Sequence, residues 1–150
     1  MTYRLRGDIG ALSIPPQKSA TIGSDLWRHT CFEAFIAIEG EAGYHEFNFA
    51  PSGEWAVYEC SDYRDGHLIA DPRLEPQVLM ASSNGTFELK ASVRLDLLSH
   101  AYARAPLRVA MTAVVEACDG VSYWALHHSH EKPDFHDRSG FTLRLERPAA

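Results

Sequence analysis

The sequence has no apolar run long enough to cross a bilayer, and only three of its 150 residues are cysteines. A transmembrane helix needs about 20 consecutive apolar residues, so we expect no membrane association. Cys31, Cys60 and Cys118 match no Cys-x-x-Cys spacing, and any disulfide would leave one of them unpaired. The first residues also lack the apolar region of a secretory signal. These features predict free thiols in a reducing compartment, which places the protein in the cytoplasm.

Basic residues are also scarce. The 14 Lys and Arg residues are outnumbered by 20 Asp and Glu residues, giving a formal net charge of −6. Because nucleic-acid affinity comes largely from basic side chains that neutralise phosphates, we expect neither DNA nor RNA as a partner. The few basic residues alternate with other residues, as at positions 3–8, which is typical of a solvated surface.

Signatures of nucleophilic catalysis are absent as well. The nearest match to a Gly-x-Ser-x-Gly motif is Pro51-Ser52-Gly53, which lacks the first glycine and is typical of a turn. We therefore expect no catalytic activity. A carboxylate pair for glycoside hydrolysis could still be drawn from Glu33, Glu46 and Glu59, although the sequence does not fix their separation.

The chain does contain the ingredients of a packed β-domain. Hydrophobic residues make up 45% of it and charged residues 23%, as in ordinary globular proteins, and its length predicts one domain over 1–150. Short segments with alternating apolar side chains recur between turn residues, which is typical of a sandwich or barrel. The predicted fold class is an all-β antiparallel β-sandwich with one short helix.

Two hairpins carry the strongest local signals. Asn84-Gly85 and Asp119-Gly120 each lie between alternating segments, and both dipeptides favour turns whose twist suits paired strands. The only helical pattern covers 96–103. In the last strand we expect Phe141, Leu143 and Leu145 to face inward. The predicted strands cover 30–38, 44–49, 55–60, 77–82, 86–94, 107–117, 121–127 and 141–145.

Polar and aromatic residues concentrate in three segments, 26–30, 44–53 and 123–138. Aromatic rings can cover the C–H groups of a sugar while charged and amide groups bond its hydroxyls. We therefore predict a binding site for a small, carbohydrate-like ligand, in which Trp27 and Trp124 stack on the sugar. The predicted ligand-binding residues are Trp27, Arg28, His29, Glu46, Asn48, Trp124, His127 and His136.

Simpler interpretations of these residues stay open. Large rings dominate sandwich cores, so Trp27, Trp55 and Trp124 could each be a core or edge aromatic. Glu33, within an apolar segment, is either a buried carboxylate paired with Arg28 or His29 or a rim residue that faces water.

The late histidines permit a metal interpretation. His128 and His130 lie on one side of an extended chain, and His136 with Asp137 could complete an open zinc site, as in a zinc-dependent enzyme. The spacing fits no established ligand motif, and a histidine-rich surface loop is the alternative. We predict no metal ligands here.

The segments 26–35 and 44–55 together resemble DOMON-like domains related to family 9 carbohydrate-binding modules. The shared pattern is an aromatic residue, a short gap, Phe-Glu-x-Phe, and then Tyr-x-Glu-Phe-x-x-x-Pro-x-Gly. With 123–126 and 132–141, the resemblance covers most of the chain. It implies a β-sandwich that binds sugars in some relatives and haem in others, without catalysis by the module itself.

Two alternatives to sugar binding follow. The resemblance implies that haem is a possible cofactor, and an axial pair could combine a methionine with a late histidine or lysine. The candidates are Met80, Met111, His127, His128, Lys132 and His136. A protein-interaction domain that uses an exposed strand edge is the other alternative.

Overall fold

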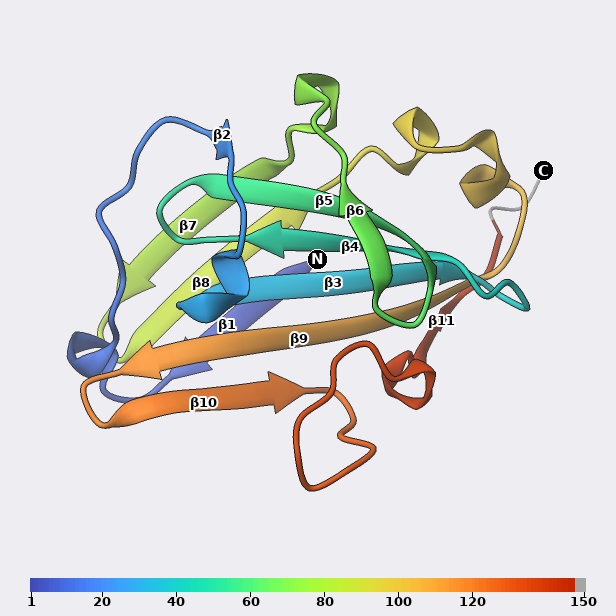
Figure 1. Ribbon diagram of the computed structural model, residues 1–150. Helices are drawn as coiled ribbons and strands as arrows, with labels where there is room; N and C mark the ends of the chain where they lie inside the picture. Colours follow the sequence, from blue (N-terminus) through green and yellow to red (C-terminus); the bar gives the residue numbers. More distant parts are fainter. Residues whose placement is uncertain (148–150) are drawn as a thin grey trace.

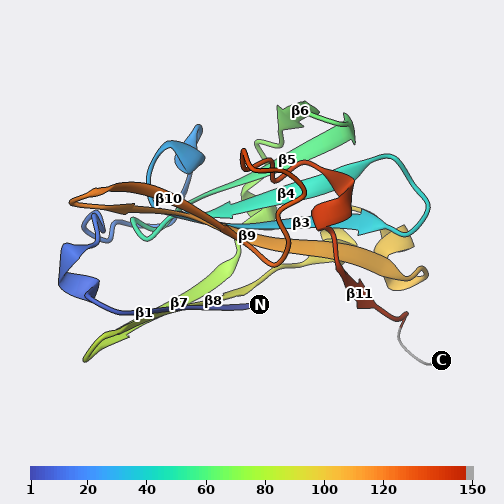
Figure 2. The ribbon, with the colours of Figure 1, turned by 90° about the horizontal axis from the view of Figure 1, so that it is seen from below.

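Two β-sheets pack face to face in the computed structural model, which describes residues 1–147. The small sheet has the order β1-β8-β7 and lies beneath the large sheet in Figure 2. The large sheet has the order β10-β9-β3-β4-β5-β2, with β11 paired to β9 and β6 paired to β5. These pairings are antiparallel except for the two-residue contact of β2 with β5. The predicted antiparallel β-sandwich is therefore confirmed.

The strands have the following bounds (Figure 1). They are β1 (Thr2–Arg6), β2 (Thr21–Ile22), β3 (Cys31–Ile38), β4 (Tyr44–Phe49), β5 (Glu54–Asp62), β6 (Asp65–Leu68), β7 (Gln77–Ser83), β8 (Thr86–Ser92), β9 (Leu107–Ala117), β10 (Gly120–Ala125) and β11 (Leu143–Leu145). Both predicted hairpins are present, β7–β8 and β9–β10. Gly85 has a φ of 69° in the first turn, a left-handed conformation that glycine adopts without a steric cost.

The N-terminal strand β1 was not predicted. Residues 3–8 suggested a solvated surface, but alternation along β1 buries the Tyr3 ring in the core and leaves Arg4 exposed, where it pairs with Glu88. The Tyr3 hydroxyl donates a hydrogen bond of 2.6 Å to the backbone carbonyl of Glu33 on β3. A strand with charged outer residues thus links the two sheets.

The predicted helix over 96–103 is replaced by two 3₁₀ turns, Leu95–Leu97 and His100–Ala103. Ser99 between them is extended and caps the second turn by accepting a hydrogen bond from the Ala101 amide, so the chain cannot continue as one helix. The other 3₁₀ turns of residues 1–147 are Ile9–Ala11, Leu26–Arg28, Pro72–Leu74 and Arg138–Gly140. No helix in this part of the chain has the length and hydropathy that a bilayer crossing needs.

The inward orientation expected along 141–145 holds only for Phe141, which is buried. Leu143 and Leu145 are exposed. Their strand, β11, pairs with one end of β9 at the rim of the large sheet, away from the small sheet (Figure 2), so the small sheet does not cover it.

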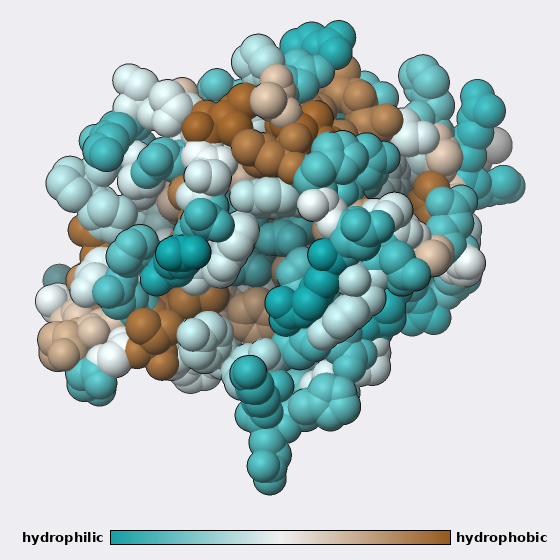
Figure 3. All heavy atoms as spheres, viewed as in Figure 1, coloured by the Kyte–Doolittle hydropathy of each residue, from teal (hydrophilic) through white to brown (hydrophobic). Residues whose placement is uncertain are grey.

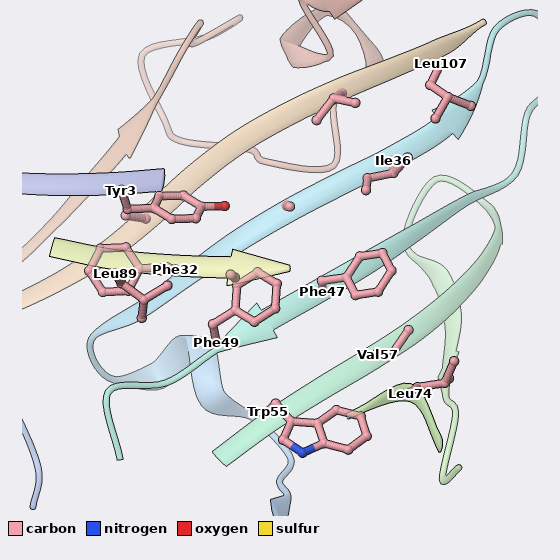
Figure 4. Packing of buried hydrophobic residues seen from close by; sticks show 14 of the residues in the cluster. Tyr3, Phe32, Ile36, Phe47, Phe49, Trp55, Val57, Leu74, Leu89 and Leu107 are labelled. Carbon is pink, nitrogen blue, oxygen red and sulfur yellow. The ribbon is translucent and has the colours of Figure 1, made fainter. Parts of the chain in front are cut away.

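The main core lies between the two sheets (Figure 4). Phe32 of β3 stacks on Phe87 of β8 with ring centroids 5.9 Å apart, and Tyr3 packs against Phe32 at 5.2 Å. Trp55 is 2% exposed and belongs to this core, which fits the simpler interpretation of that tryptophan. Because strand side chains alternate, the remaining side chains of β3, β4 and β5 point to the opposite face of the large sheet.

Candidate functional site

A pocket of about 370 Å³ lies on this outer face of the large sheet. A hollow is visible there in the space-filling view (Figure 3). Strands β3, β4, β5 and β9 form its floor, and its walls come from the turn Leu26–Arg28, the β5–β6 hairpin, β10 and the segment 133–136. The lining residues are Trp27, Glu33, Glu46, Tyr58, Cys60, Arg64, Gly66, Val114, Tyr123, Pro133, Phe135 and His136.

Glu33 supplies a buried carboxyl group to the floor. It is 2% exposed, and its Oε1 atom has no hydrogen-bond partner within the described residues. Thr112 lies opposite Glu33 on the adjacent strand β9, and its buried hydroxyl also lacks a hydrogen bond of ordinary geometry in this part of the chain, although it is close enough to the Glu33 carboxyl to oppose the rise of its pKa. Burial, and then repulsion from Glu46, raises the pKa of Glu33 well above its ordinary value. The group can therefore act as a neutral carboxylic acid that both donates and accepts hydrogen bonds.

The suggested pairing of Glu33 with Arg28 or His29 does not occur. Both of these side chains are exposed, and His29 Nδ1 lies 2.9 Å from Glu116 Oε2 on the surface. The Glu33 side chain points to the outer face of the sheet, where no cation contacts it among residues 1–147.

A second carboxyl group, that of Glu46, is held by buried neighbours. Asn48 Nδ2 donates a hydrogen bond of 2.8 Å to Glu46 Oε1, and the Cys31 thiol donates to Asn48 Oδ1 at 3.7 Å. Burial raises the pKa of Glu46. Asn48 is therefore a positioning residue that fixes one oxygen of Glu46 and leaves the other, Oε2, free to face the pocket.

His136 reaches the same floor from the loop that follows β10. Its Nδ1 atom lies 2.7 Å from the Tyr44 hydroxyl, and its Nε2 atom lies 3.7 Å from Glu46 Oε2. Burial, and then the positive charge of Arg64, lowers the pKa of His136 to about 4, so its imidazole is neutral at pH 7. The ligand atoms of Glu46, Cys60 and His136 all lie within 4.8 Å of one another, so these three residues could hold a metal ion.

Asp134 anchors this loop to the β5–β6 hairpin. Its carboxylate accepts hydrogen bonds from the Tyr63 hydroxyl at 2.5 Å and from Arg64 Nη2 at 2.9 Å. The same carboxylate accepts the backbone N–H of His136 at 3.2 Å. These contacts position His136 above the floor, although the two segments are far apart in sequence.

Aromatic rings form the rim of the pocket. Trp27 is 40% exposed and meets Tyr58 edge-on at a centroid distance of 5.8 Å. Tyr123 is half exposed and meets Phe135 in a similar way at 6.2 Å. The pocket therefore combines a polar, acidic floor with partly exposed rings at its mouth.

The structure brings only some of the predicted ligand-binding residues together. Trp27, Glu46 and His136 line the pocket, and Asn48 lies directly behind Glu46. Trp124 lies on the side of β10 opposite to Tyr123 and is 60% exposed. Its indole N–H donates a hydrogen bond to the Ser122 hydroxyl. The predicted residues that do not line the pocket are Arg28, His29, Asn48, Trp124 and His127.

The residues that were candidates for a zinc site or for haem ligation are dispersed in the structure. His130 pairs with Asp137 at 3.1 Å, whereas His136 turns toward Tyr44, so the late histidines do not share one centre. Met80 and Met111 pack against the main core between the sheets. Within residues 1–147, only Glu46, Cys60 and His136 form a group of three converging His, Cys, Asp or Glu ligand atoms.

The sequence interpretation missed several pocket residues, including Tyr58, Cys60, Arg64, Tyr123 and Phe135. One feature of the sequence could have identified two of them. Period-two alternation puts Tyr58 and Cys60 on the face of β5 opposite to the apolar core residue Val57. The alternation therefore places both side chains on the outer face of the large sheet, where the pocket lies.

Comparisons of the chain with protein-family models, curated proteins and solved structures gave no match.

Proposed function

We propose that this protein is a non-catalytic binding module for a small, carbohydrate-like ligand, which it holds in the pocket on the outer face of the large sheet. The observation that carries this proposal is Glu33, a residue of the pocket floor whose buried Oε1 atom has no hydrogen-bond partner among residues 1–147. Leaving such a group unsatisfied costs about 1–3 kcal/mol. A ligand hydroxyl that reaches Glu33 would remove this cost.

The size and lining of the pocket support a sugar-like ligand. Its volume of about 370 Å³ is near the lower end of the range of roughly 300–1,000 Å³ for small-molecule sites, which suits a monosaccharide. Trp27 and Tyr123 offer apolar ring surface for sugar C–H groups at the mouth. Glu33 and Glu46 offer hydrogen-bonding groups for hydroxyls at the floor. The pocket thus offers apolar surface at its mouth and hydrogen-bonding groups at its floor, and a sugar can use both.

The resemblance to DOMON-like domains supports the same ligand class. Trp27, Glu33 and Glu46 belong to the segments that carry this resemblance, and all three line the pocket. Haem is less well supported, because Met80 and Met111 pack against the core and cannot face the pocket together with His136. We place this function in the cytoplasm, since Cys31 and Cys60 are buried free thiols.

Calorimetric titration of the full chain against a panel of neutral mono- and disaccharides, with a chelator present, tests this proposal. At least one sugar is expected to bind. Trp27→Ala and Glu33→Leu, which removes the hydrogen-bonding group at similar size, should each weaken that binding by about tenfold or more, equivalent to a loss of about 1.4 kcal/mol.

Trp124→Ala is the matched control, because it removes the same side chain from the opposite side of β10. It should leave sugar binding unchanged. The proposal fails if no sugar in the panel binds, or if Trp124→Ala abolishes binding and Trp27→Ala does not. A Soret band after addition of haem would favour the haem alternative.

A further inference from the structure

We propose that Glu46, Cys60 and His136 form a zinc-binding site at the floor of the pocket. Their ligand atoms lie within 4.8 Å of one another, with His136 Nε2 and Glu46 Oε2 3.7 Å apart. A tetrahedral zinc ion with bonds of about 2.0–2.3 Å separates its ligand atoms by roughly 3.3–3.8 Å. Small side-chain adjustments would therefore complete the coordination. This inference does not depend on sugar binding.

The fold aims the three side chains at one point. Tyr44 and Cys60 are direct neighbours across β4 and β5, and Glu46 lies two residues after Tyr44, on the same face of the sheet. On the other side of β5, Gly66 lies opposite Cys60. A Cβ atom at Gly66 would lie only 2.5 Å from Cys60 Sγ, so the glycine leaves the space that the thiol occupies.

Neighbouring groups already orient two of the three ligands. The Tyr44 hydroxyl contacts Nδ1 of His136 at 2.7 Å and leaves Nε2 directed toward Glu46. Asn48 holds Oε1 of Glu46 at 2.8 Å and leaves Oε2 available. Metal-binding histidines and carboxylates commonly have such supporting hydrogen bonds, which fix the ring orientation and the ligand atom.

The ligand set suits zinc rather than magnesium or calcium, which prefer oxygen ligands alone. On binding, the Cys60 S–H bond breaks, the thiolate sulfur bonds to the ion, and one proton goes to solvent. His136 binds through a neutral nitrogen and Glu46 through a carboxylate oxygen. Three protein ligands leave a fourth coordination position for water or a ligand, and all three residues line the pocket together with Glu33.

Cobalt, which takes zinc-type sites, gives a direct test on the full chain after treatment with a chelator. Titration with Co²⁺, without sugar, should produce a thiolate-to-cobalt charge-transfer band at one equivalent, and added Zn²⁺ should abolish it. Cys60→Ser and His136→Ala should each remove the band. Tyr44→Phe keeps all three ligands and should weaken zinc binding about 10–100-fold, as the loss of a supporting hydrogen bond does.

Cys118→Ser and His130→Ala are matched controls. Cys118 is an exposed thiol, and His130 pairs with Asp137 away from the pocket. Both variants should keep the band, and circular dichroism checks that each variant folds. Absence of the band in the wild-type chain, or its loss in His130→Ala but not in His136→Ala, overturns the zinc site. Because sugar binding is measured with a chelator and metal binding without sugar, failure of one proposal is distinguishable from failure of the other.

Discussion

At the scale of single residues, Glu33 is expected to affect both ligand binding and stability. Its carboxyl group is buried, its Oε1 atom has no hydrogen-bond partner in the part of the chain that the structure describes, and its pKa is raised by burial and by Glu46. In the unfolded chain, the glutamate side chain has its ordinary pKa of about 4.3. As the pH rises, the unfolded state therefore loses this proton before the folded state does. The free energy of unfolding decreases as the pH rises from about 4.3 to the higher pKa of the folded state.

Glu33→Gln should remove this part of the pH dependence. We expect the variant to exceed the wild type in free energy of unfolding by about 1–3 kcal/mol at pH 7, with the difference shrinking toward pH 4. Urea denaturation at several pH values measures it. Glu46 also faces the pocket and contributes to the raised pKa of Glu33, so the difference between the two proteins reports the Glu33 carboxyl group together with its repulsion from Glu46.

Glu59→Gln is the control, because Glu59 lies on β5 with an exposed side chain. Its effect should stay within about 0.5 kcal/mol at every pH. A destabilised Glu33→Gln variant at pH 7 would show that the carboxyl group has a stabilising partner.

The residues of the site were only partly predictable. Trp27, Glu46 and His136 were selected because polar and aromatic types cluster around them in sequence. Arg64 and Phe135 could not be assigned, because they reach the pocket from loops whose path is set by contacts such as the Arg64–Asp134 ion pair. Alternation within a strand is local information, whereas the packing of a loop against a sheet is not.

At the scale of elements, the β7–β8 hairpin depends on its turn. Gly85 has a φ of 69°, a conformation that costs a residue with a Cβ atom about 1–2 kcal/mol. Its carbonyl also accepts a hydrogen bond of 3.0 Å from the Gly7 amide, which ties the turn to the end of β1. We expect Gly85→Ala to lower the free energy of unfolding by about 1–2 kcal/mol.

Gly85→Asn is the matched comparison, since asparagine tolerates left-handed backbone better than alanine does. Thermal denaturation should rank the wild type first, the asparagine variant second and the alanine variant last. Equal stability of the two variants would mean that backbone conformation does not determine the effect.

Elements with both a turn signal and alternation were predicted correctly, such as β7, β8 and β9. The short strands β2 and β6 were missed because four or fewer residues do not establish a period. The 3₁₀ turns near 95–103 were mistaken for a helix because their apolar spacing fits a helical face, while the extended backbone of Ser99 that separates them depends on the fold. Short elements take their conformation from their neighbours.

At the scale of the whole molecule, the contact between the two sheets determines stability. Phe87 of the small sheet is 5% exposed and stacks on Phe32 of the large sheet. Phe87→Ala would leave a cavity between the layers and should cost about 3–5 kcal/mol. Leu79→Ala, on the same sheet but 71% exposed, should change stability by less than about 0.5 kcal/mol. Chemical denaturation of both variants tests this, and similar losses in the two would contradict the sandwich packing.

The central position of β3 also has a consequence for protein engineering. Residues 31–37 are buried on both faces, and β3 lies between β4 and β9, so the pocket floor is built into the most enclosed strand of the large sheet. The walls come instead from connecting segments such as the turn Leu26–Arg28 and residues 133–136. New loops could thus be grafted around the pocket while its floor, with the two carboxyl groups, stays unchanged. The outer face of the large sheet is therefore a scaffold for receptors with altered selectivity.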